Sequence, residues 1–383
     1  MVRKANARLE RPAPYPPIAY PTPVFDKLAP EICELIFSSA CLDSGYTGRS
    51  LSLVSKYISE TSKPVKFQSL VLRNLSQVQA LASILEKIAP HHRRVRHLCV
   101  LCNYTQLYNT TTLRHDETND KTTSSPLHRI TSTLSRLRLN LRRDISRQEI
   151  WEPAVVSGTS FSLTIEEMMR LSLVRILNSV AHSLNVLTIS IQTPRNDVAL
   201  HGSPSLPHLR ELTITYACEY YPRVPTRILD TFQQLPALTR LNLARYECGN
   251  GPLDLVRQIQ RLAPSLTHVR LPSVVAGWNR WLDMDAILSS TPTGERHRPR
   301  LPSTTKKIFI QPPLPPPTIG PARTYYEETL EECRALAMGN DQIVLEWPDP
   351  VPWKFDVNEM EWEWLERING GDGCWRSENV MVP

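Results

Sequence analysis

The chain has 383 residues, 41% of them hydrophobic, so it can hold two or three ordinary domains, or one elongated repeat domain with a small module. Its net charge of +6 is well below that of a dedicated nucleic-acid-binding protein, and it has no run of about 18 apolar residues to span a membrane. Proline is frequent at 33 residues and glycine scarce at 13, which favours rigid extended connections over phosphate-binding loops.

The eight cysteines are scattered, and the N-terminal stretch lacks the apolar core of a secretory signal. Both observations predict a reducing intracellular compartment, cytoplasmic or nuclear. Residues 1–22 mix basic side chains with prolines and cannot bury a core, which predicts a disordered tail. A nuclear address or a tether to a membrane surface is the alternative interpretation of its charge.

Residues 23–66 contain two helical patterns with a polar turn between them. In the first, residues 28–37, Pro30 suits the first helical turn because its missing N–H would be unpaired there. Apolar side chains at helical spacing share one face of this helix: Leu28, Ile32, Leu35 and Ile36. The second pattern covers residues 51–58, and an extended run follows at residues 67–72. We therefore expect a small helical module that leads into a strand.

The two helical patterns resemble an F-box. The second reads Leu-Ser-Leu-Val-Ser-Lys from Leu51 to Lys56, which is similar to many divergent fungal F-box proteins. The first contributes Leu28, Pro30, Glu31, Ile32, Ile36 and Phe37 to the resemblance. The family usually has a tryptophan two residues after the basic position of the second helix, where this chain has Ile58.

F-box families bind the small Skp adaptor of cullin–RING ubiquitin ligases through these helices. The resemblance therefore implies that the module docks on a Skp-like adaptor and, through it, on a cullin. The implied adaptor-binding residues are Leu28, Pro30, Ile32, Ile36, Leu51, Leu53 and Val54, although some of them must hold the two helices together. The alternative interpretation is that the helices only cap the following domain.

From residue 67 onward an apolar spacing of the form L-x-x-L-x-L recurs. The sets are Phe67/Leu70/Leu72, Val95/Leu98/Val100, Leu184/Leu187/Ile189, Leu209/Leu212/Ile214, Leu238/Leu241/Leu243 and Leu266/Val269/Leu271. Their starting residues are 28 apart, then 89 apart, then 25, 29 and 28 apart. These steps fit leucine-rich repeats, in which each unit is a short strand with a returning helix, and the long gap leaves room for degenerate units and an insertion.

Helical patterns lie between these strands, as such repeats require. Thr164 starts a capping box, and its helix places Met169, Leu173, Ile176 and Val180 on one face. Pro252 opens another helix with Leu255, Ile259 and Leu262 inward, and a weaker one covers residues 228–235. Ala217 and Tyr246 stand where leucine-rich repeats usually have a carbonyl-binding asparagine. The sequence therefore predicts an α/β fold: an F-box-like module at 23–66, then a leucine-rich-repeat-like solenoid with irregular repeats over 67–383.

Two segments interrupt the first half of the predicted solenoid. Residues 104–126 are rich in Thr, Asn, Ser and Asp and predict an exposed, disordered insertion. Residues 127–147 form a basic amphipathic pattern. It is either a repeat helix with a solvated basic face or a contact for an acidic partner or an anionic membrane.

The second half continues less regularly beyond Pro272. Strands are expected at residues 305–310 and 342–345, and a helix at 325–337. The proline-rich tract at 311–322 is either a loop along the solenoid edge or a ligand for proline-reading modules. Five of the eight tryptophans, Trp347, Trp353, Trp362, Trp364 and Trp375, predict a cap at 347–383 that covers the open end of the solenoid, with an aromatic binding pocket as the alternative.

Residues that could carry chemistry are few. Cys99 and Cys102, preceded by His91, His92 and His97, lack the second ligand pair that a zinc site needs, so we predict no metal and no cofactor. The usual phosphate, dinucleotide, metalloprotease and hydrolase motifs are missing from the sequence. We therefore expect that the protein is not an enzyme.

The remaining expectation concerns a target protein. Strand alternation sends the residues beside the buried ones to the opposite face, where they would form a target-binding row. The row comprises Thr188, Ser190, Glu211, Thr213, Thr215, Arg240, Asn242, His268 and Arg270. Its mixed charge favours a protein partner over nucleic acid. The predicted function is substrate recognition for a Skp–cullin–F-box ubiquitin ligase, and the alternative is an interaction scaffold that acts without a ligase.

Overall fold

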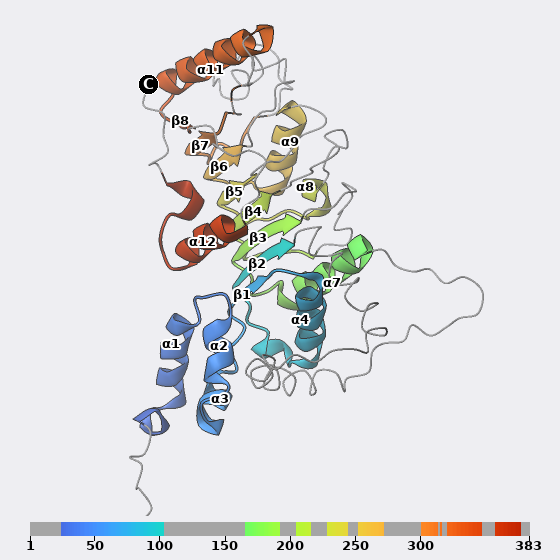
Figure 1. Cartoon of the computed structure of the whole chain (residues 1–383), viewed down its shortest axis with the longest axis vertical. Helices are drawn as coiled ribbons and strands as arrows, with labels where there is room; N and C mark the ends of the chain where they lie inside the picture. The colour runs from blue at the N-terminus through green and yellow to red at the C-terminus, as the bar shows by residue number, and fades with distance from the viewer. Residues whose placement is uncertain are drawn as a thin grey trace, which may run out of the picture.

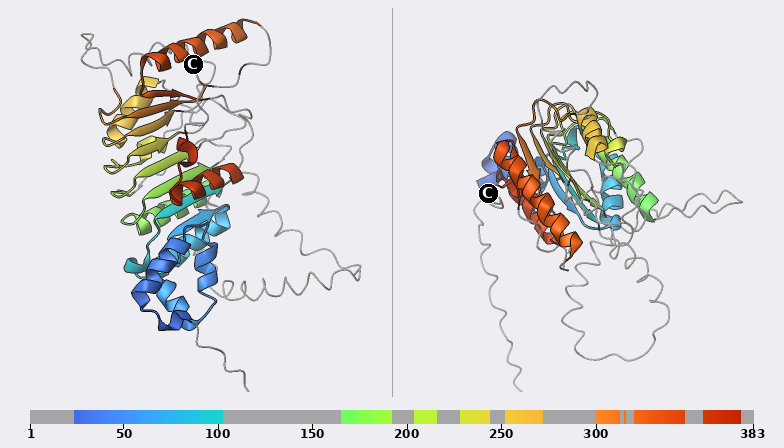
Figure 2. Two further views of the ribbon diagram at one scale, coloured as in Figure 1. Left: turned by 90° about the vertical axis from the view of Figure 1, so that its left-hand side faces the viewer. Right: turned by 90° about the horizontal axis from the view of Figure 1, so that it is seen from above.

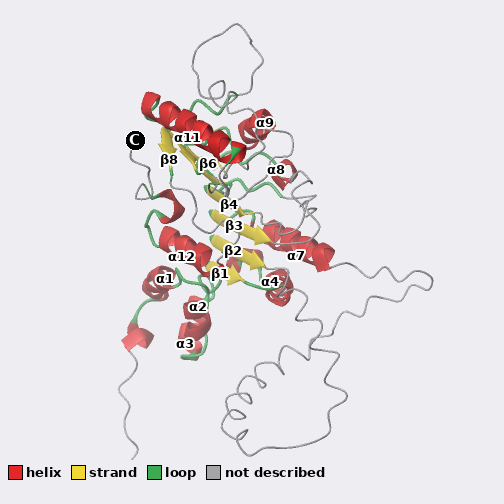
Figure 3. Cartoon of the chain, turned by 45° about the horizontal axis from the view of Figure 1, so that its top comes forward, coloured by secondary structure: helices red, strands yellow, loops and turns green. Residues whose placement is uncertain are grey.

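The computed structural model describes residues 24–102, 165–191, 204–215, 228–243, 252–271, 300–312, 315, 320–346 and 357–376. Its strands form one open sheet of eight parallel strands, so the protein is α/β as predicted (Figures 1 and 3). Several expectations fall outside the described residues: the tail at 1–22, the segments at 104–126 and 127–147, the missing asparagines at Ala217 and Tyr246, Trp347, Trp353, and most of the proline-rich tract.

The strands follow one another across the sheet in chain order. They are β1 (Ser69–Leu72), β2 (His97–Cys102), β3 (Val186–Ile191), β4 (Glu211–Thr215), β5 (Arg240–Asn242), β6 (His268–Leu271), β7 (Lys307–Ile310) and β8 (Ile343–Leu345). Every strand expected from the apolar spacing is present. Val100 of β2 pairs directly with Ile189 of β3, so no further strand separates them in the sheet.

Helices cover one face of the sheet and bury the apolar side chains of the repeated spacing. They are α4 (Leu75–Lys87), α7 (Ile165–Val180), α8 (Ile228–Thr231) and α9 (Pro252–Leu262). The predicted inward residues of α7 and α9 lie in this core, and α8 is shorter than the expected 228–235. Leu187, Leu212, Leu241 and Val269 face these helices from four neighbouring strands and are fully buried.

A proline-containing turn precedes several strands. Leu206-Pro207 and Leu235-Pro236 each begin such a turn, and the N–H of Leu209 donates to the Leu206 carbonyl at 3.2 Å. Proline suits the second position of a turn because its φ is already fixed there. Hydroxyl groups then join successive units, since Thr239 Oγ1 donates to the Arg210 carbonyl and Thr267 Oγ1 donates to the Thr239 carbonyl. These hydrogen bonds extend the backbone ladder beyond the strands.

The remaining elements lie at the two ends of the sheet and on its second face. A short turn, η2 (Pro90–His92), links α4 to β2, and α11 (Pro321–Gly339) lies at the β8 end (Figure 1). Helix α12 (Val357–Ile368) and the turn η4 (Gly373–Trp375) lie on the opposite face from α7 and α9 (Figure 2). No helix in the described part of the chain is long and apolar enough to cross a membrane.

The N-terminal module contains η1 (Val24–Lys27), α1 (Pro30–Ala40), α2 (Tyr46–Leu51) and α3 (Lys56–Ser62). The single helix expected at residues 51–58 is wrong, because Ser55 is the N-cap of α3 and its Oγ accepts a hydrogen bond from Ile58 N at 3.2 Å. Gly48 in α2 packs closely on the segment before β1, where an added Cβ would lie 2.2 Å from the Lys66 carbonyl oxygen.

Two leucines of α7 test the position of the core. Leu173 is fully buried, whereas Leu171 is 39% exposed on the same helix. We expect Leu173→Ala to lower the free energy of unfolding by about 2–5 kcal/mol, and Leu171→Ala by less than about 1 kcal/mol. Urea unfolding measures both, and similar losses for the two variants would contradict the assigned face of α7.

Candidate interaction surfaces

The N-terminal module has a small core of its own. Phe37 of α1 and Ile58 of α3 are buried in it, with Cys33, Cys41 and Val65. Leu28 and Leu51 pack against this core, and the Tyr57 hydroxyl donates to the Leu28 carbonyl at 2.6 Å. Ile58, which stands at the usual tryptophan position, thus serves the internal packing of the module.

Large apolar side chains remain exposed on the outside of this module. Ile32, Leu35 and Ile36 are 46%, 67% and 42% exposed, and their spacing places them on one face of α1. Leu53 and Val54, in the turn between α2 and α3, are 74% and 63% exposed. We call these five residues the apolar surface of the module. Such side chains gain free energy when a partner removes them from water.

The structure sorts the residues that the F-box resemblance implied for adaptor binding. Leu28 and Leu51 are half-buried against the module core, so their side chains hold the helices together. Pro30 is exposed at the start of α1, where it opens the helix. Ile32, Ile36, Leu53 and Val54 belong to the apolar surface, which Leu35 extends.

The predicted target-binding residues do share one face of the sheet. Glu211, Arg240 and His268 are register partners on β4, β5 and β6, and Thr188 and Thr213 are partners on β3 and β4. Their neighbours in each strand point to the helix-covered face, as strand alternation requires. We call the side of β3–β8 that carries these residues the polar face.

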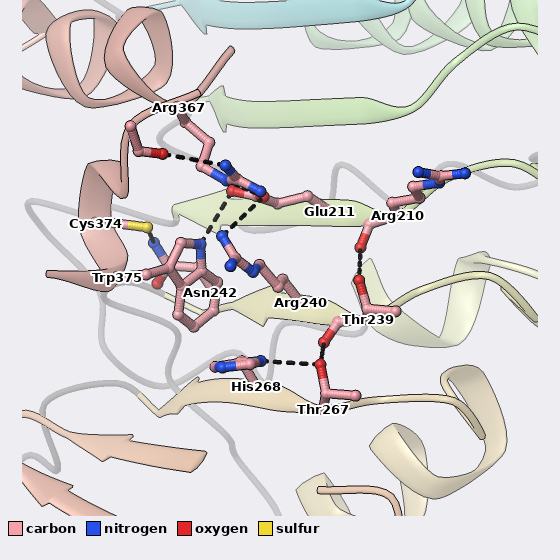
Figure 4. A network of polar contacts seen from close by, with 11 residues as sticks. Arg210, Glu211, Thr239, Arg240, Asn242, Thr267, His268, Arg367, Cys374 and Trp375 are labelled. Atoms are coloured by element: carbon pink, nitrogen blue, oxygen red, sulfur yellow. Dashed lines mark hydrogen bonds and ion pairs between the residues drawn. The ribbon is translucent and has the colours of Figure 1, made fainter. Parts of the chain in front are cut away.

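The expectation that this row is exposed is wrong. Thr188, Ser190, Glu211, Thr213, Thr215 and Asn242 are buried, and Arg240, His268 and Arg270 are half-buried. The reason is that residues 357–376, which comprise α12 and η4 and which we call the C-terminal segment, lie over this side of the sheet (Figures 2 and 4). The tryptophans expected to cover the open end are placed differently as well: Trp364 and Trp375 are buried against the sheet, and Trp362 is 53% exposed.

Glu211 is the centre of the network that joins the polar face to the C-terminal segment (Figure 4). Its Oε2 accepts a hydrogen bond from Arg367 Nε at 2.7 Å, and its Oε1 accepts one from Trp375 Nε1 at 3.0 Å. Arg240 Nη1 of the next strand lies 4.0 Å from Oε2. A carboxylate that is only 4% exposed is thereby balanced by two guanidinium groups and an indole N–H.

A second charged group lies two strands farther along. Arg270 Nη2 is 2.9 Å from Glu346 Oε2, and Arg270 Nη1 donates to the Cys374 carbonyl at 2.9 Å. Burial raises the pKa of Glu346, although Arg270 opposes the shift. Burial also raises the pKa of Glu363 on α12 to about 7, against Arg270 and with the nearby carboxylates Glu359, Glu346 and Glu366. Arg270 is therefore the cation that stabilises the ionised forms of both Glu346 and Glu363, in a site where burial limits solvation.

The C-terminal segment makes apolar contact at the other end of the sheet. Trp364 packs on Val71, Cys99 and Leu101, which are side chains of β1 and β2. Arg73, just after β1, forms a double ion pair with Glu361, in which its Nε lies 3.0 Å from Oε2. The Asn369 amide also donates to the carbonyl of Leu42 in the N-terminal module at 3.1 Å. The segment thus spans the sheet from β1 to β7 and contacts the module.

Sequence reasoning missed Glu361 and Arg367, and it assigned Trp364 and Trp375 to the open end of the solenoid instead of to this face of the sheet. The signal for α12 was available, because Val357, Met360, Trp364 and Ile368 recur at helical spacing. The location of α12 could not be predicted, because no local pattern indicates which part of a sheet a distant helix will cover.

Cys99 and Cys102 point to opposite faces of β2, as strand alternation requires, and both are buried. Burial, more than the neighbouring Glu361, raises the pKa of the Cys99 thiol well above its usual range. Within the described ranges, no three His, Cys, Asp or Glu side chains gather in a group that could hold a metal ion. In comparisons with known proteins, neither a family model nor a curated protein sequence matches this chain.

The raised pKa of Glu363 makes stability depend on pH. In the folded protein this carboxyl keeps its proton up to a pH of about 7, whereas an unfolded glutamate loses it near about pH 4.3. Its contribution to stability is therefore complete below about pH 4 and is lost as the pH rises through about 7. We expect Glu363→Gln to raise the free energy of unfolding by about 1–2 kcal/mol at pH 8, and by much less at pH 5.

Urea unfolding at both pH values, followed by tryptophan fluorescence, measures this difference. Glu328→Gln is the matched control, because Glu328 is exposed on α11 and its replacement should act equally at the two pH values. An effect of Glu363→Gln that does not change between pH 5 and pH 8 would contradict the burial of a protonated carboxyl at this position.

Proposed function

We propose that this protein is the target-recognition subunit of a Skp–cullin–F-box ubiquitin ligase. The N-terminal module would dock on a Skp-like adaptor, and the sheet domain, a leucine-rich-repeat-like solenoid, would select the target protein. The protein would perform no chemistry itself and would act in the cytoplasm or nucleus. It contributes proximity, since tethering a target beside the conjugating enzyme replaces a bimolecular encounter with one at high effective concentration.

The apolar surface of the module carries this proposal. Phe37 and Ile58 complete an internal core, and yet the side chains at Ile32, Ile36, Leu53 and Val54 remain in water. These are positions that the F-box resemblance implies for adaptor binding. A module that served packing alone would gain by having polar residues there.

The arrangement of the sheet supports the second half of the proposal. Each strand lies beside its predecessor in the chain. A leucine–proline turn precedes β4 and β5, and a threonine hydroxyl contact precedes β5 and β6. Such repetition supports a solenoid, because the units of a solenoid stack in chain order and bury a common core. The long sheet side opposite the helices is the kind of surface that repeat proteins use for binding.

One observation favours the alternative, an interaction scaffold without a ligase. The module covers the β1 edge of the sheet, because Val71 N donates to the Ser44 carbonyl and Gly48 packs on Lys66. Helices in this position protect the unpaired edge of the sheet whether or not they bind an adaptor. The two functions therefore differ only in what the apolar surface of the module contacts.

Co-expression with a Skp-like adaptor, followed by size-exclusion chromatography, separates these functions. We expect the full chain to co-elute with the adaptor. Leu53→Asp/Val54→Asp should weaken the complex at least ~100-fold, because it places charges at two exposed apolar side chains that the adaptor would bury. Ile84→Asp is the matched control, since Ile84 is 41% exposed on α4, away from the module. Both variants should keep the wild-type unfolding temperature.

Failure of the folded wild-type chain to bind the adaptor would leave the module as a cap and favour the scaffold. Loss of binding in Ile84→Asp as well would show that the apolar surface of the module does not determine the interaction.

A further inference from the structure

We infer that the C-terminal segment is a detachable occupant of the sheet, and that a target helix of the same chemistry binds in its place. The fitting partner is an amphipathic helix followed by a turn, with an arginine and a tryptophan that reach Glu211. The role of this helix as part of a target rests on the proposed function, whereas the site itself does not. It is defined by contacts within this chain.

The two faces of the sheet differ in the free energy that their exposure to water would cost. On the helix-covered face, Leu187, Leu212 and Leu241 would each lose a fully buried apolar environment if the helices left. On the polar face, the residues of the same strands are threonines, serine, asparagine and charged groups, with Val186 as the one apolar side chain of β3 there. Water can hydrogen-bond to these polar side chains, so uncovering the polar face costs less free energy than uncovering the apolar face.

The polar face is also incompletely satisfied while the segment covers it. Ser190 Oγ, Thr215 Oγ1 and Asn242 Oδ1 are buried without a hydrogen-bond partner among the described residues. Asn242 lies directly against the segment, with its Nδ2 3.3 Å from Cys374 Sγ, so removal of the segment would give its Oδ1 access to water. Burial also raises the pKa of the Glu363 carboxyl on α12, because the packed segment keeps water from its ionised form.

The contacts between the C-terminal segment and the sheet define the groups that a replacing helix must provide. Glu211 takes an arginine N–H and an indole N–H, and Arg270 takes a main-chain carbonyl. The indole ring of Trp375 fills the space beside Phe309, with ring centroids 5.6 Å apart. Val71, Cys99 and Leu101 take the apolar side of a helix. A basic helix without the tryptophan, or a plain acidic peptide, leaves Glu211 or the apolar end unpartnered.

Two cysteines of β2 measure detachment directly. Cys99 and Cys102 are both fully buried, but Cys99 lies under Trp364 and Cys102 lies in the helix-covered core. Native full-length protein is treated with iodoacetamide, and labelling of each thiol is followed by peptide mass analysis. We expect Cys99 to react at least ~10-fold faster than Cys102, because local opening precedes global unfolding. Arg367→Ala should accelerate Cys99 on the order of another 10-fold and leave Cys102 unchanged. Equal rates for the two thiols in both proteins would overturn the inference.

A synthetic peptide of residues 357–376 with a fluorescent label then tests replacement. We expect it to bind full-length Arg367→Ala at least ~10-fold more tightly than wild type, whose own segment competes at high effective concentration. Adding Glu211→Gln to Arg367→Ala should remove this binding, because the peptide arginine loses its carboxylate. Fluorescence anisotropy measures each affinity.

A covalent lock provides the control for the location of binding. Asn242 Nδ2 lies 3.3 Å from Cys374 Sγ, so the thiol introduced by Asn242→Cys can form a disulfide with Cys374 in oxidised glutathione. In the Arg367→Ala background, the oxidised lock should abolish peptide binding and reduction should restore it. Binding that survives the lock, or no binding to a chain whose Cys99 reacts freely, would overturn the inference. Neither result depends on the adaptor, so failure of the ligase proposal would be seen separately.

Discussion

The parallel register of the sheet is the constraint on which the rest of the structure depends. Because every strand lies beside its predecessor in chain order, side chains at matching positions line up in rows, and alternation sends each row to one face. One set of rows is apolar and is covered by α4, α7, α8 and α9. The other set is mostly polar on β3–β6 and apolar on β1 and β2, and it receives the C-terminal segment. The two kinds of cover differ in chemistry because the two sets of rows do.

Much of the sheet could be predicted from the sequence, because the apolar spacing within each repeat is enough to identify its strand. A buried triplet such as Leu209, Leu212 and Ile214 identifies the strand and its inward face without knowledge of any neighbour. The cover of the polar face could not be predicted in this way. Glu211 and Arg367 are 156 positions apart, and no spacing rule connects them. The predicted row was therefore correct in its composition and alignment but wrong in its exposure.

The N-terminal module shows a second limit of local patterns. Residues 51–58 fit a helical spacing, but the Ser55 side chain caps α3 and ends any continuous helix. The resulting turn places Leu53 and Val54 at the surface, where a continuous helix would have distributed them around its axis. Sequence resemblance could name the apolar residues of the module, and only the fold could separate Leu28 and Leu51, which pack inward, from those that face water.

The C-terminal segment also connects the two surfaces. Asn369 binds the Leu42 carbonyl of the module, Glu361 pairs with Arg73 beside β1, and Arg367 reaches Glu211 in the middle of the sheet. The segment that contacts Glu211 therefore also makes a hydrogen bond with the module. Two binding events that act on one shared element are thermodynamically linked, and the linkage is reciprocal. If an adaptor docks on the module and a target helix occupies the polar face, as proposed, this segment is the element through which the two binding events would be coupled.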